Sequence, residues 1–190
     1  PFPPVPKFNF TGLSKFFYMA KEVCAYLAVS VDGFIADKDE SVQFLEEVKG
    51  EGDNGYSDFY NSVDVVVMGG RTFRWLIDNG VKENPYQGKK VVVISSIVTD
   101  IDWDIEFYSG DLDELFNRFN NNEKIWIVGG GKLISTLINL KIITSLKLTI
   151  APTILTQGVE LFNSIDEEVK LHLRNVTKYN QFVELDYEII

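Results

Sequence analysis

Three consecutive glycines, Gly129, Gly130 and Gly131, follow the short apolar run Lys124 to Val128 and lead into a helical pattern that begins at Lys132. Glycine has no Cβ, so a phosphate can approach the backbone N–H groups of such a turn, and the dipole of the following helix favours an anion. A glycine cluster is also how an α/β protein turns from strand to helix, and for this segment alone that structural alternative is favoured. The segment is therefore a candidate phosphate cradle that needs support from elsewhere in the chain.

Two further apolar runs also end in small, polar or cationic residues. Val63 to Met68 leads into Gly69, Gly70, Arg71 and Thr72, and Lys89 to Ile94 stops at Ser95 and Ser96. Continuous apolar runs are typical of parallel strands covered on both faces, and ligands of such sheets bind beyond the carboxyl ends of the strands. We therefore expect three strand ends to bring glycine, arginine and serine to one rim, where they suit a phosphate-bearing ligand.

Alternating strand and helix patterns place these strand ends. Strands are expected at Glu22 to Ser30, Asp64 to Met68, Lys90 to Ser95, Ile105 to Tyr108 and Lys124 to Val128. Helices are expected at Glu40 to Lys49, Ser57 to Ser62, Thr72 to Asp78, Lys132 to Leu140 and from Asp111 onward. Extended segments then follow at Ser145 to Pro152, Val169 to Lys178 and Phe182 to Ile190. This order predicts a three-layer α/β sandwich with a mostly parallel central sheet and an antiparallel C-terminal hairpin.

Composition limits the class of protein. A chain of 190 residues that is 45% hydrophobic can bury one substantial core, and we expect a single domain over residues 19–190. The net charge of -10 and the pI near 4.6 argue against nonspecific binding to nucleic acid or to anionic membranes, which need a broad basic face. A bound nucleotide would have to be held by local cations and backbone amides.

The chain contains one cysteine, Cys24, and one histidine, His172. A disulfide within the chain is impossible, no His/Cys cluster has the spacing of a metal site, and no Ser-His-Asp or Cys-His arrangement can be argued. We expect no bound metal. Cys24 lies in an apolar run and is expected to be a small buried hydrophobe, and His172 is expected on the surface of a strand.

Two expectations concern location and the chain start. No run approaches the roughly 20 apolar residues of a membrane span, so a soluble, cytoplasmic protein is expected. Residues 1–18 are rich in proline and phenylalanine and lack the continuous apolar centre of a signal peptide, and Met19 resembles a natural start. We interpret residues 1–18 as an N-terminal extension.

Five segments, taken in order, resemble the dihydrofolate reductase superfamily. They are LAVSVDGFIA (Leu27 to Ala36), VVVMGGRTF, VVVISS, IWIVGGGKL and LKLTIAPTILTQGVELF (Leu146 to Phe162). The resemblance is strongest to the branch that includes the reductase domain of the bifunctional riboflavin-biosynthesis deaminase-reductase, and it covers nearly everything after Met19. It implies a dihydrofolate reductase-like fold, NADPH as cofactor and hydride transfer to a small heterocycle, either pterin-like or a ribosylamino-pyrimidine. Relatives in this branch are often homodimers through their C-terminal strands.

The resemblance also implies roles for particular residues. Ala28 and Ile35 match positions that meet the nicotinamide, and Asp32 lies in the mobile loop beside it. The segment Gly69 to Thr72 matches the turn that holds the adenine-side phosphates, and Ser95 and Ser96 match hydroxyls near the ribose 2′-phosphate. The glycines Gly129 to Gly131 match the pyrophosphate loop, which carries a cis peptide in the family, and Thr149 matches a threonine of the substrate pocket.

One departure from the family pattern concerns the phosphate turn. The family commonly has Gly-Arg-x-Thr there, whereas this chain has Gly69-Gly70-Arg71-Thr72, so the guanidinium is displaced by one residue. A cation is what a preference for NADPH requires physically. We expect Arg71 to reach the 2′-phosphate, with Lys132 or Lys89 assisting.

A second departure concerns the proton donor. Where dihydrofolate reductases carry a carboxylate in the first helix, the register places Ser41, and the replacement candidates are Asp32, Gln43, Glu46 and Glu47. Phe44 could form one wall of a pocket for a flat heterocycle. The alternative is that it packs in the core, since its position fits helical spacing. We find no basic cluster for a phosphate on the substrate.

Alternatives to a reductase therefore stay open. Because a serine stands at the acid position, a catalytically silent nucleotide-binding sensor or scaffold is one hypothesis. A plain α/β domain without a cofactor is another.

Overall fold

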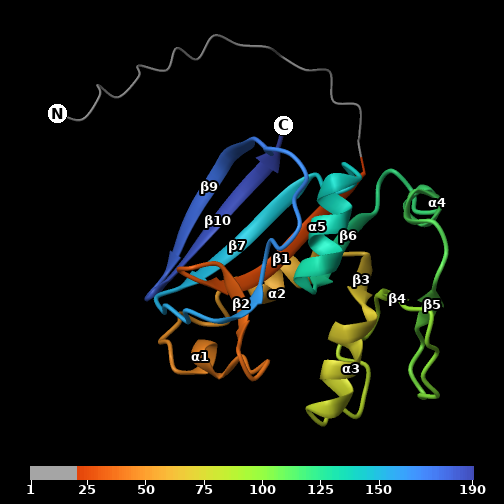
Figure 1. Cartoon of the computed structure of the whole chain (residues 1–190), viewed down its shortest axis with the longest axis horizontal. Helices are drawn as coiled ribbons and strands as arrows, with labels where there is room; N and C mark the ends of the chain where they lie inside the picture. The colour runs from red at the N-terminus through yellow and green to blue at the C-terminus, as the bar shows by residue number, and fades with distance from the viewer. Residues whose placement is uncertain (1–20) are drawn as a thin grey trace.

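The computed structural model describes residues 21–190, so the interpretations of residues 1–18 and of Met19 lie outside the described residues. Its main sheet has the strand order β5-β4-β3-β6-β1-β7-β10-β9 (Figure 1). The strands are β1 Glu22–Ser30, β3 Val65–Gly69, β4 Lys90–Ile94, β5 Glu106–Tyr108, β6 Lys124–Gly129, β7 Ser145–Ala151, β9 Leu171–Tyr179 and β10 Phe182–Ile189. The first six are parallel to one another, whereas β10 runs antiparallel to both β7 and β9. The predicted fold class is thereby confirmed.

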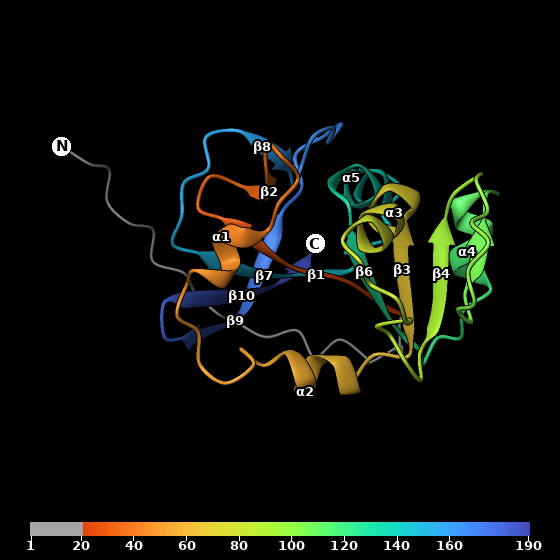
Figure 2. The same cartoon turned by 90° about the horizontal axis from the view of Figure 1, so that it is seen from below.

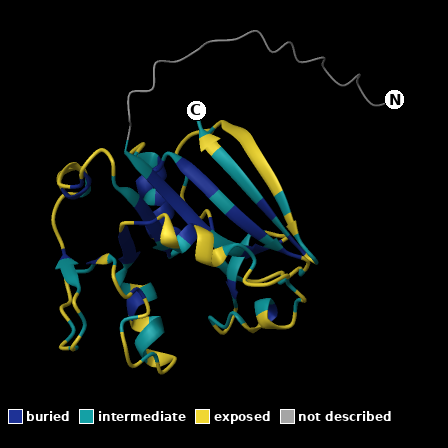
Figure 3. Ribbon diagram, turned by 180° about the vertical axis from the view of Figure 1, so that it is seen from behind, coloured by how far each residue is buried: buried dark blue, intermediate teal, exposed yellow. Residues whose placement is uncertain are grey.

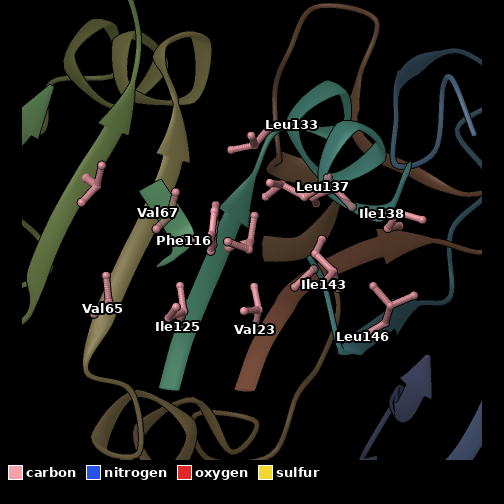
Figure 4. Packing of buried hydrophobic residues seen from close by; sticks show 14 of the residues in the cluster. Val23, Val65, Val67, Phe116, Ile125, Leu133, Leu137, Ile138, Ile143 and Leu146 are labelled. Carbon is pink, nitrogen blue, oxygen red and sulfur yellow. The ribbon is translucent and has the colours of Figure 1, made fainter. Parts of the chain in front are cut away.

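Helices cover both faces of this sheet. They are α1 Gln43–Glu46, α2 Tyr56–Asn61, α3 Gly70–Asp78, α4 Leu112–Asn117 and α5 Gly131–Asn139. On β3, Val65 and Val67 belong to the core cluster that includes α4 and α5, part of which is seen in Figure 4. Val66 and Met68 belong to the cluster on the other face with residues of α2 and α3. The apolar runs are continuous because both faces of the strands are buried.

A small second sheet was not predicted. It pairs β2, Phe34–Asp37, antiparallel with β8, Gly158–Glu160. Each strand is too short to produce a recognisable alternation, and the two come from distant parts of the chain. Figure 2 shows β2 and β8 side by side.

The helix predicted over 40–49 was wrong in extent, because α1 covers only Gln43–Glu46. The preceding residues form a turn instead: Glu40 has a φ of 61°, and the Asp37 carboxylate accepts hydrogen bonds from the backbone N–H groups of Asp39 and Ser41, both at 2.9 Å. Such local hydrogen bonds from an aspartate compete with helix formation.

The expectations for the lone cysteine and histidine are confirmed. Cys24 is 3% exposed, and burial raises the pKa of its thiol to about 11, which keeps it protonated and unreactive at neutral pH. His172 is exposed on β9, the edge strand seen along one side of the sheet in Figure 3.

Candidate functional site

The carboxyl ends of β4, β3 and β6 lie side by side, because these strands are neighbours in the sheet. A Cβ built on Gly70 would lie 2.8 Å from Ser95 Oγ, and one built on Gly130 would lie 3.4 Å from Thr72 Oγ1. The three strand ends are therefore in contact with one another, as expected from their sequences. We call this region, made of residues 69–72, 95–96 and 129–132, the glycine rim.

Two helices begin at the glycine rim without side-chain caps. The N-cap residues are Gly69 for α3 and Gly130 for α5, and neither helix has an acidic residue in its first turn. Instead, Arg71 and Lys132 place cations there, where the helix dipole disfavours them. The first N–H groups of both helices are thus available to an anion.

The three glycines of the β6–α5 turn have different constraints. Gly129 has a φ of 137°, a conformation that favours glycine, and its peptide bond to Gly130 is cis. A Cβ on Gly131 would collide with the carbonyl oxygen of Glu160, the last residue of β8. Gly130 has a φ of -82°, and a Cβ there would meet only Thr72. Gly129 and Gly131 are thus explained by the backbone and its packing, whereas Gly130 leaves an open approach to the rim.

Strands β1 and β6 diverge toward the rim. They pair only as far as Ala25 and Ile127, whereas β1 continues to pair with β7 up to Ser30. Ala28 lies beyond the point of divergence, half-buried, and pairs with Thr149 of β7. Ile35, in β2, packs against the core cluster on the α5 side. The structure thus places Ala28 where the backbone of β1 no longer has β6 as a neighbour.

Asp32 connects two loops through its carboxylate. Oδ1 accepts hydrogen bonds from the Ser30 hydroxyl (2.6 Å) and the Leu155 N–H (3.1 Å), and Oδ2 accepts one from the Thr156 N–H (2.7 Å). The bond from Ser30 acts most strongly, and together these bonds hold the pKa of Asp32 below its ordinary value. An exposed carboxylate with a lowered pKa is ionised at neutral pH, which makes it a poor proton donor.

Ser41 lies just before α1. Its hydroxyl accepts a hydrogen bond from the Gln43 N–H at 3.1 Å. The replacement candidates Gln43, Glu46 and Glu47 are exposed. Phe44 is buried in a small core cluster with Ala151 and Phe182, in line with the packing alternative.

The cations at the rim are arranged differently from the expectation. Arg71 forms an ion pair with Glu40, whose hydrogen bond raises the pKa of the guanidinium, and the Trp75 indole N–H donates to the Glu40 carbonyl oxygen at 2.8 Å. Arg71 therefore anchors the loop before α1 on α3. The assisting role suggested for Lys89 was wrong: it lies at the start of β4, and its ammonium donates to the Val63 carbonyl oxygen at 2.7 Å. A five-residue strand places it about 15 Å from the rim.

Arg74 was missed in the sequence. A Cβ on Gly70 would lie 3.3 Å from its Nη1 and 2.8 Å from Ser95 Oγ, so this guanidinium lies over the glycine that replaces the family's arginine. Positions four apart on a helix share a face, and the pair Gly70 and Arg74 was a usable signal.

A buried acid, Glu184, was also missed. It is 4% exposed and pairs across β10 and β7 with Thr149. Within residues 21–190 it is the only buried charged side chain. Lys147 Nζ lies 2.8 Å from Glu184 Oε1 and 3.7 Å from Asp186 Oδ2. Burial lowers the pKa of Lys147, but these carboxylates more than offset it, and the pKa is raised.

Tyr26 adds a hydroxyl to this cluster. Burial is the main cause that raises its pKa, the charge of Glu184 acts in the same direction, and Thr149 acts in the opposite one. Its ring packs against Phe59 (4.1 Å between ring centroids) and lies near Trp126 (6.2 Å between ring centroids). We call Tyr26, Lys147, Thr149 and Glu184 the sheet-face cluster. Glutamate at an inward position of a strand was the sequence signal for it.

A surface hollow of about 1060 Å³ lies elsewhere, around the amino-terminal ends of β1 and β6. Its lining mixes acidic residues, such as Glu22 and Glu123, with cations such as Lys124 and Lys141. None of the rim residues takes part. Within the described residues, no group of three His, Cys, Asp or Glu could hold a metal ion, and no helix could cross a membrane.

Comparison with known proteins places this geometry in context. A family model described as the RibD C-terminal domain matches residues 21–185. The uncharacterized protein YwjB of Bacillus subtilis (strain 168) is 34% identical over 172 residues, which are 89% of this chain and 98% of YwjB.

Two solved structures share the fold. A Shewanella sp. PV-4 protein provisionally assigned to riboflavin biosynthesis has a TM-score of 0.80 at 22% identity, covering 89% of this chain and 99% of its own. The Thermotoga maritima diaminohydroxyphosphoribosylaminopyrimidine deaminase/5-amino-6-(5-phosphoribosylamino)uracil reductase has a TM-score of 0.64 at 15% identity, covering 90% of this chain but 57% of its own.

Proposed function

Since the chain belongs to the RibD C-terminal domain family, we propose that it is a reductase that uses NADPH to reduce a small heterocycle. The observation that carries the proposal is the glycine rim, where two uncapped helix starts and the hydroxyls of Thr72 and Ser95 meet. Helix N-termini and backbone amides favour phosphate groups without any net positive charge on the protein. A dinucleotide with two phosphates side by side suits two adjacent helix starts.

The residues around Ala28 fit the other end of such a cofactor. Because β1 and β6 diverge after Ala25 and Ile127, a flat ring at this point would meet backbone and small side chains rather than a continuous strand pair. When bound, the nicotinamide supplies hydride chemistry, and the protein has to position it against the substrate. Ala28, which pairs with Thr149 of the sheet-face cluster, would lie between the cofactor and that cluster.

The sheet-face cluster is the part of this protein suited to the substrate and its proton. Neither Asp32 nor Ser41 offers a good proton donor, whereas Glu184 is a buried carboxylate next to the hydroxyls of Thr149 and Tyr26. Such a group can accept hydrogen bonds from ring N–H groups and help move a proton to a ring nitrogen. A pterin-like ring or a ribosylamino-pyrimidine presents such N–H groups, and these remain the substrate classes of the proposal.

A titration tests the proposal directly. We expect NADPH to raise the melting temperature, because a ligand at a hundred times its dissociation constant stabilises the native state by about 2.7 kcal/mol. Addition of a dihydropterin or a ribosylamino-pyrimidine acceptor should then lower the absorbance of NADPH. The absence of any thermal shift would sink the cofactor assignment. Binding without oxidation across the acceptor panel would favour the alternative, a catalytically silent nucleotide sensor or scaffold, which the serine at position 41 motivates.

We also propose that the functional unit is a homodimer formed through β9. Its residues are exposed along most of the strand, including Leu171 (40%), Leu173 (47%) and Val176 (53%) (Figure 3). An exposed apolar edge strand is a template for pairing with another chain. Sedimentation equilibrium should report twice the chain mass, and Leu173→Glu with Val176→Lys should shift it to the monomer. A monomeric wild type would contradict this.

A further inference from the structure

Two arginines on α3, Arg71 and Arg74, stand at the glycine rim in different states. Arg71 is held by Glu40, and through Glu40 it is connected to Trp75 and to the loop before α1. Arg74 has no ion pair within residues 21–190. A guanidinium already bound to a carboxylate has to give up that partner before it can bind a phosphate, whereas a free one does not.

The position of Arg74 is as informative as its lack of a partner. Its Nη1 lies 3.3 Å from the place where a side chain on Gly70 would begin, and Ser95 Oγ lies 2.8 Å from the same place. Any Cβ at residue 70 would meet both groups at 3.3 Å or less. Glycine at position 70 therefore makes room for the Arg74 side chain beside a serine hydroxyl.

We propose that Arg74, and not Arg71, distinguishes NADPH from NADH by binding the 2′-phosphate together with Ser95. This deepens the proposed function and rests on it. A phosphate monoester carries nearly two charges at neutral pH and accepts several hydrogen bonds, so the unpaired guanidinium matches it. The Ser95 hydroxyl, which donates to the Ile97 carbonyl oxygen at 3.0 Å, can turn to the phosphate instead. The displaced arginine of the phosphate turn is thereby replaced from the next turn of the helix. Arg71 serves instead to hold the loop before α1 against α3.

The test compares two matched variants, Arg74→Gln and Arg71→Gln, on the same exposed helix face. Dissociation constants for NADPH and NADH, and for adenosine 2′,5′-bisphosphate and 5′-AMP, are measured by titration calorimetry. We expect Arg74→Gln to weaken NADPH and the bisphosphate by about 10- to 100-fold, the range for a hydrogen-bonded charge, and to leave NADH and AMP within about threefold. Arg71→Gln should change each pair of ligands by the same factor.

The outcomes separate this inference from the proposed function. If Arg74→Gln keeps the wild-type preference, or if Arg71→Gln alone removes it, the assignment of the 2′-phosphate to Arg74 is wrong while cofactor binding stands. If the wild type binds neither dinucleotide, the proposed function fails. Arg74→Lys provides a second variant with the charge retained, and it should keep more of the preference than Arg74→Gln. Unchanged melting temperatures of the free variants show that folding is intact.

Discussion

The starts of α3 and α5 differ from the start of α4 in how their free N–H groups are satisfied. At α4 the Asp111 side chain accepts a hydrogen bond from the Glu114 N–H at 2.9 Å, and Asp113 and Glu114 add negative charge to the first turn. At the rim, α3 and α5 begin at glycine with no cap and no acid. A helix whose first N–H groups are bound by its own side chain needs no other hydrogen-bond partner there. A helix that starts without a cap, and beside cations, leaves these N–H groups available to a bound anion.

The cations of the two regions differ in a similar way, since some have an acidic partner and others do not. Lys147 is flanked by Glu184 and Asp186 on the face of the sheet. Arg74 and Lys132 at the rim form no ion pair within residues 21–190. Charges that are already paired contribute to the fold, and charges left without a partner at a shared rim indicate what the protein binds. Four sets of variants test this distinction.

The largest effect is expected at the paired cation. Lys147→Met leaves Glu184 buried without its partner at 2.8 Å, and loss of one member of a buried pair costs about 3 kcal/mol or more. The double variant Lys147→Met with Glu184→Leu should recover most of that loss, because no unpaired charge remains. Urea unfolding of the four proteins measures this cycle. A single-variant loss below about 1 kcal/mol would mean that water reaches the carboxylate.

Substitutions at two neighbouring rim glycines should change different properties: the free energy of unfolding at Gly131 and the affinity for NADPH at Gly130. Gly131→Ala forces a Cβ into the Glu160 carbonyl oxygen and should cost about 2 kcal/mol of unfolding free energy, as overpacking does. Gly130→Ala meets only Thr72 at 3.4 Å and should leave stability nearly unchanged, but it should weaken NADPH at least about tenfold by occupying the approach to the amides. Full NADPH affinity in Gly130→Ala would remove Gly130 from the cradle.

A rim helix can be converted into one that caps itself. Gly69 has extended φ and ψ values, and a Cβ there meets nothing closer than 3.8 Å, so Gly69→Asp is sterically allowed. The new cap should stabilise the free protein by about 1 kcal/mol and weaken NADPH by competing for the same N–H groups.

The counterpart of this variant is Asp111→Ala, which should lose about 1 kcal/mol and leave NADPH affinity alone. Thermal unfolding with and without NADPH measures both. Equal NADPH affinity in Gly69→Asp and wild type would contradict the rim as an anion site.

The smallest expected effect is the pH dependence of Asp32. Its pKa is lowered in the folded protein, so its hydrogen bonds contribute stability above the ordinary aspartate pKa of about 4, and that contribution is lost as the pH falls through the lowered value. Asp32→Asn should therefore lower the melting temperature at pH 7, and the difference from wild type should shrink below about pH 4. A difference that stays constant down to pH 3 would show that the charge of Asp32 does not matter.

Much of this architecture could be predicted because it depends on local patterns. Parallel strands buried on both faces require continuous apolar runs, and Val65 to Met68 and Val91 to Val93 show them directly. The turns that follow require small residues, so the glycine rim was visible as three strand ends. The short pairing of β2 with β8 was invisible, because four and three residues carry too little periodicity and their contact depends on the whole fold.

Local sequence patterns were enough to identify the strands of the main sheet, to show where they end, and to show that glycines, hydroxyls and arginines follow those ends. Which arginine faces the rim depends on the tertiary structure, because Glu40 reaches α3 from a distant loop and pairs with Arg71, while the phase of the helix directs Arg74 over Gly70. It also revealed the burial of Glu184 against Lys147, since the cross-strand neighbours of a side chain are set by the register of β10 on β7. Residue types and strand ends can be identified from neighbouring positions in the sequence. The pairing of charges cannot, because it depends on which distant segments come into contact.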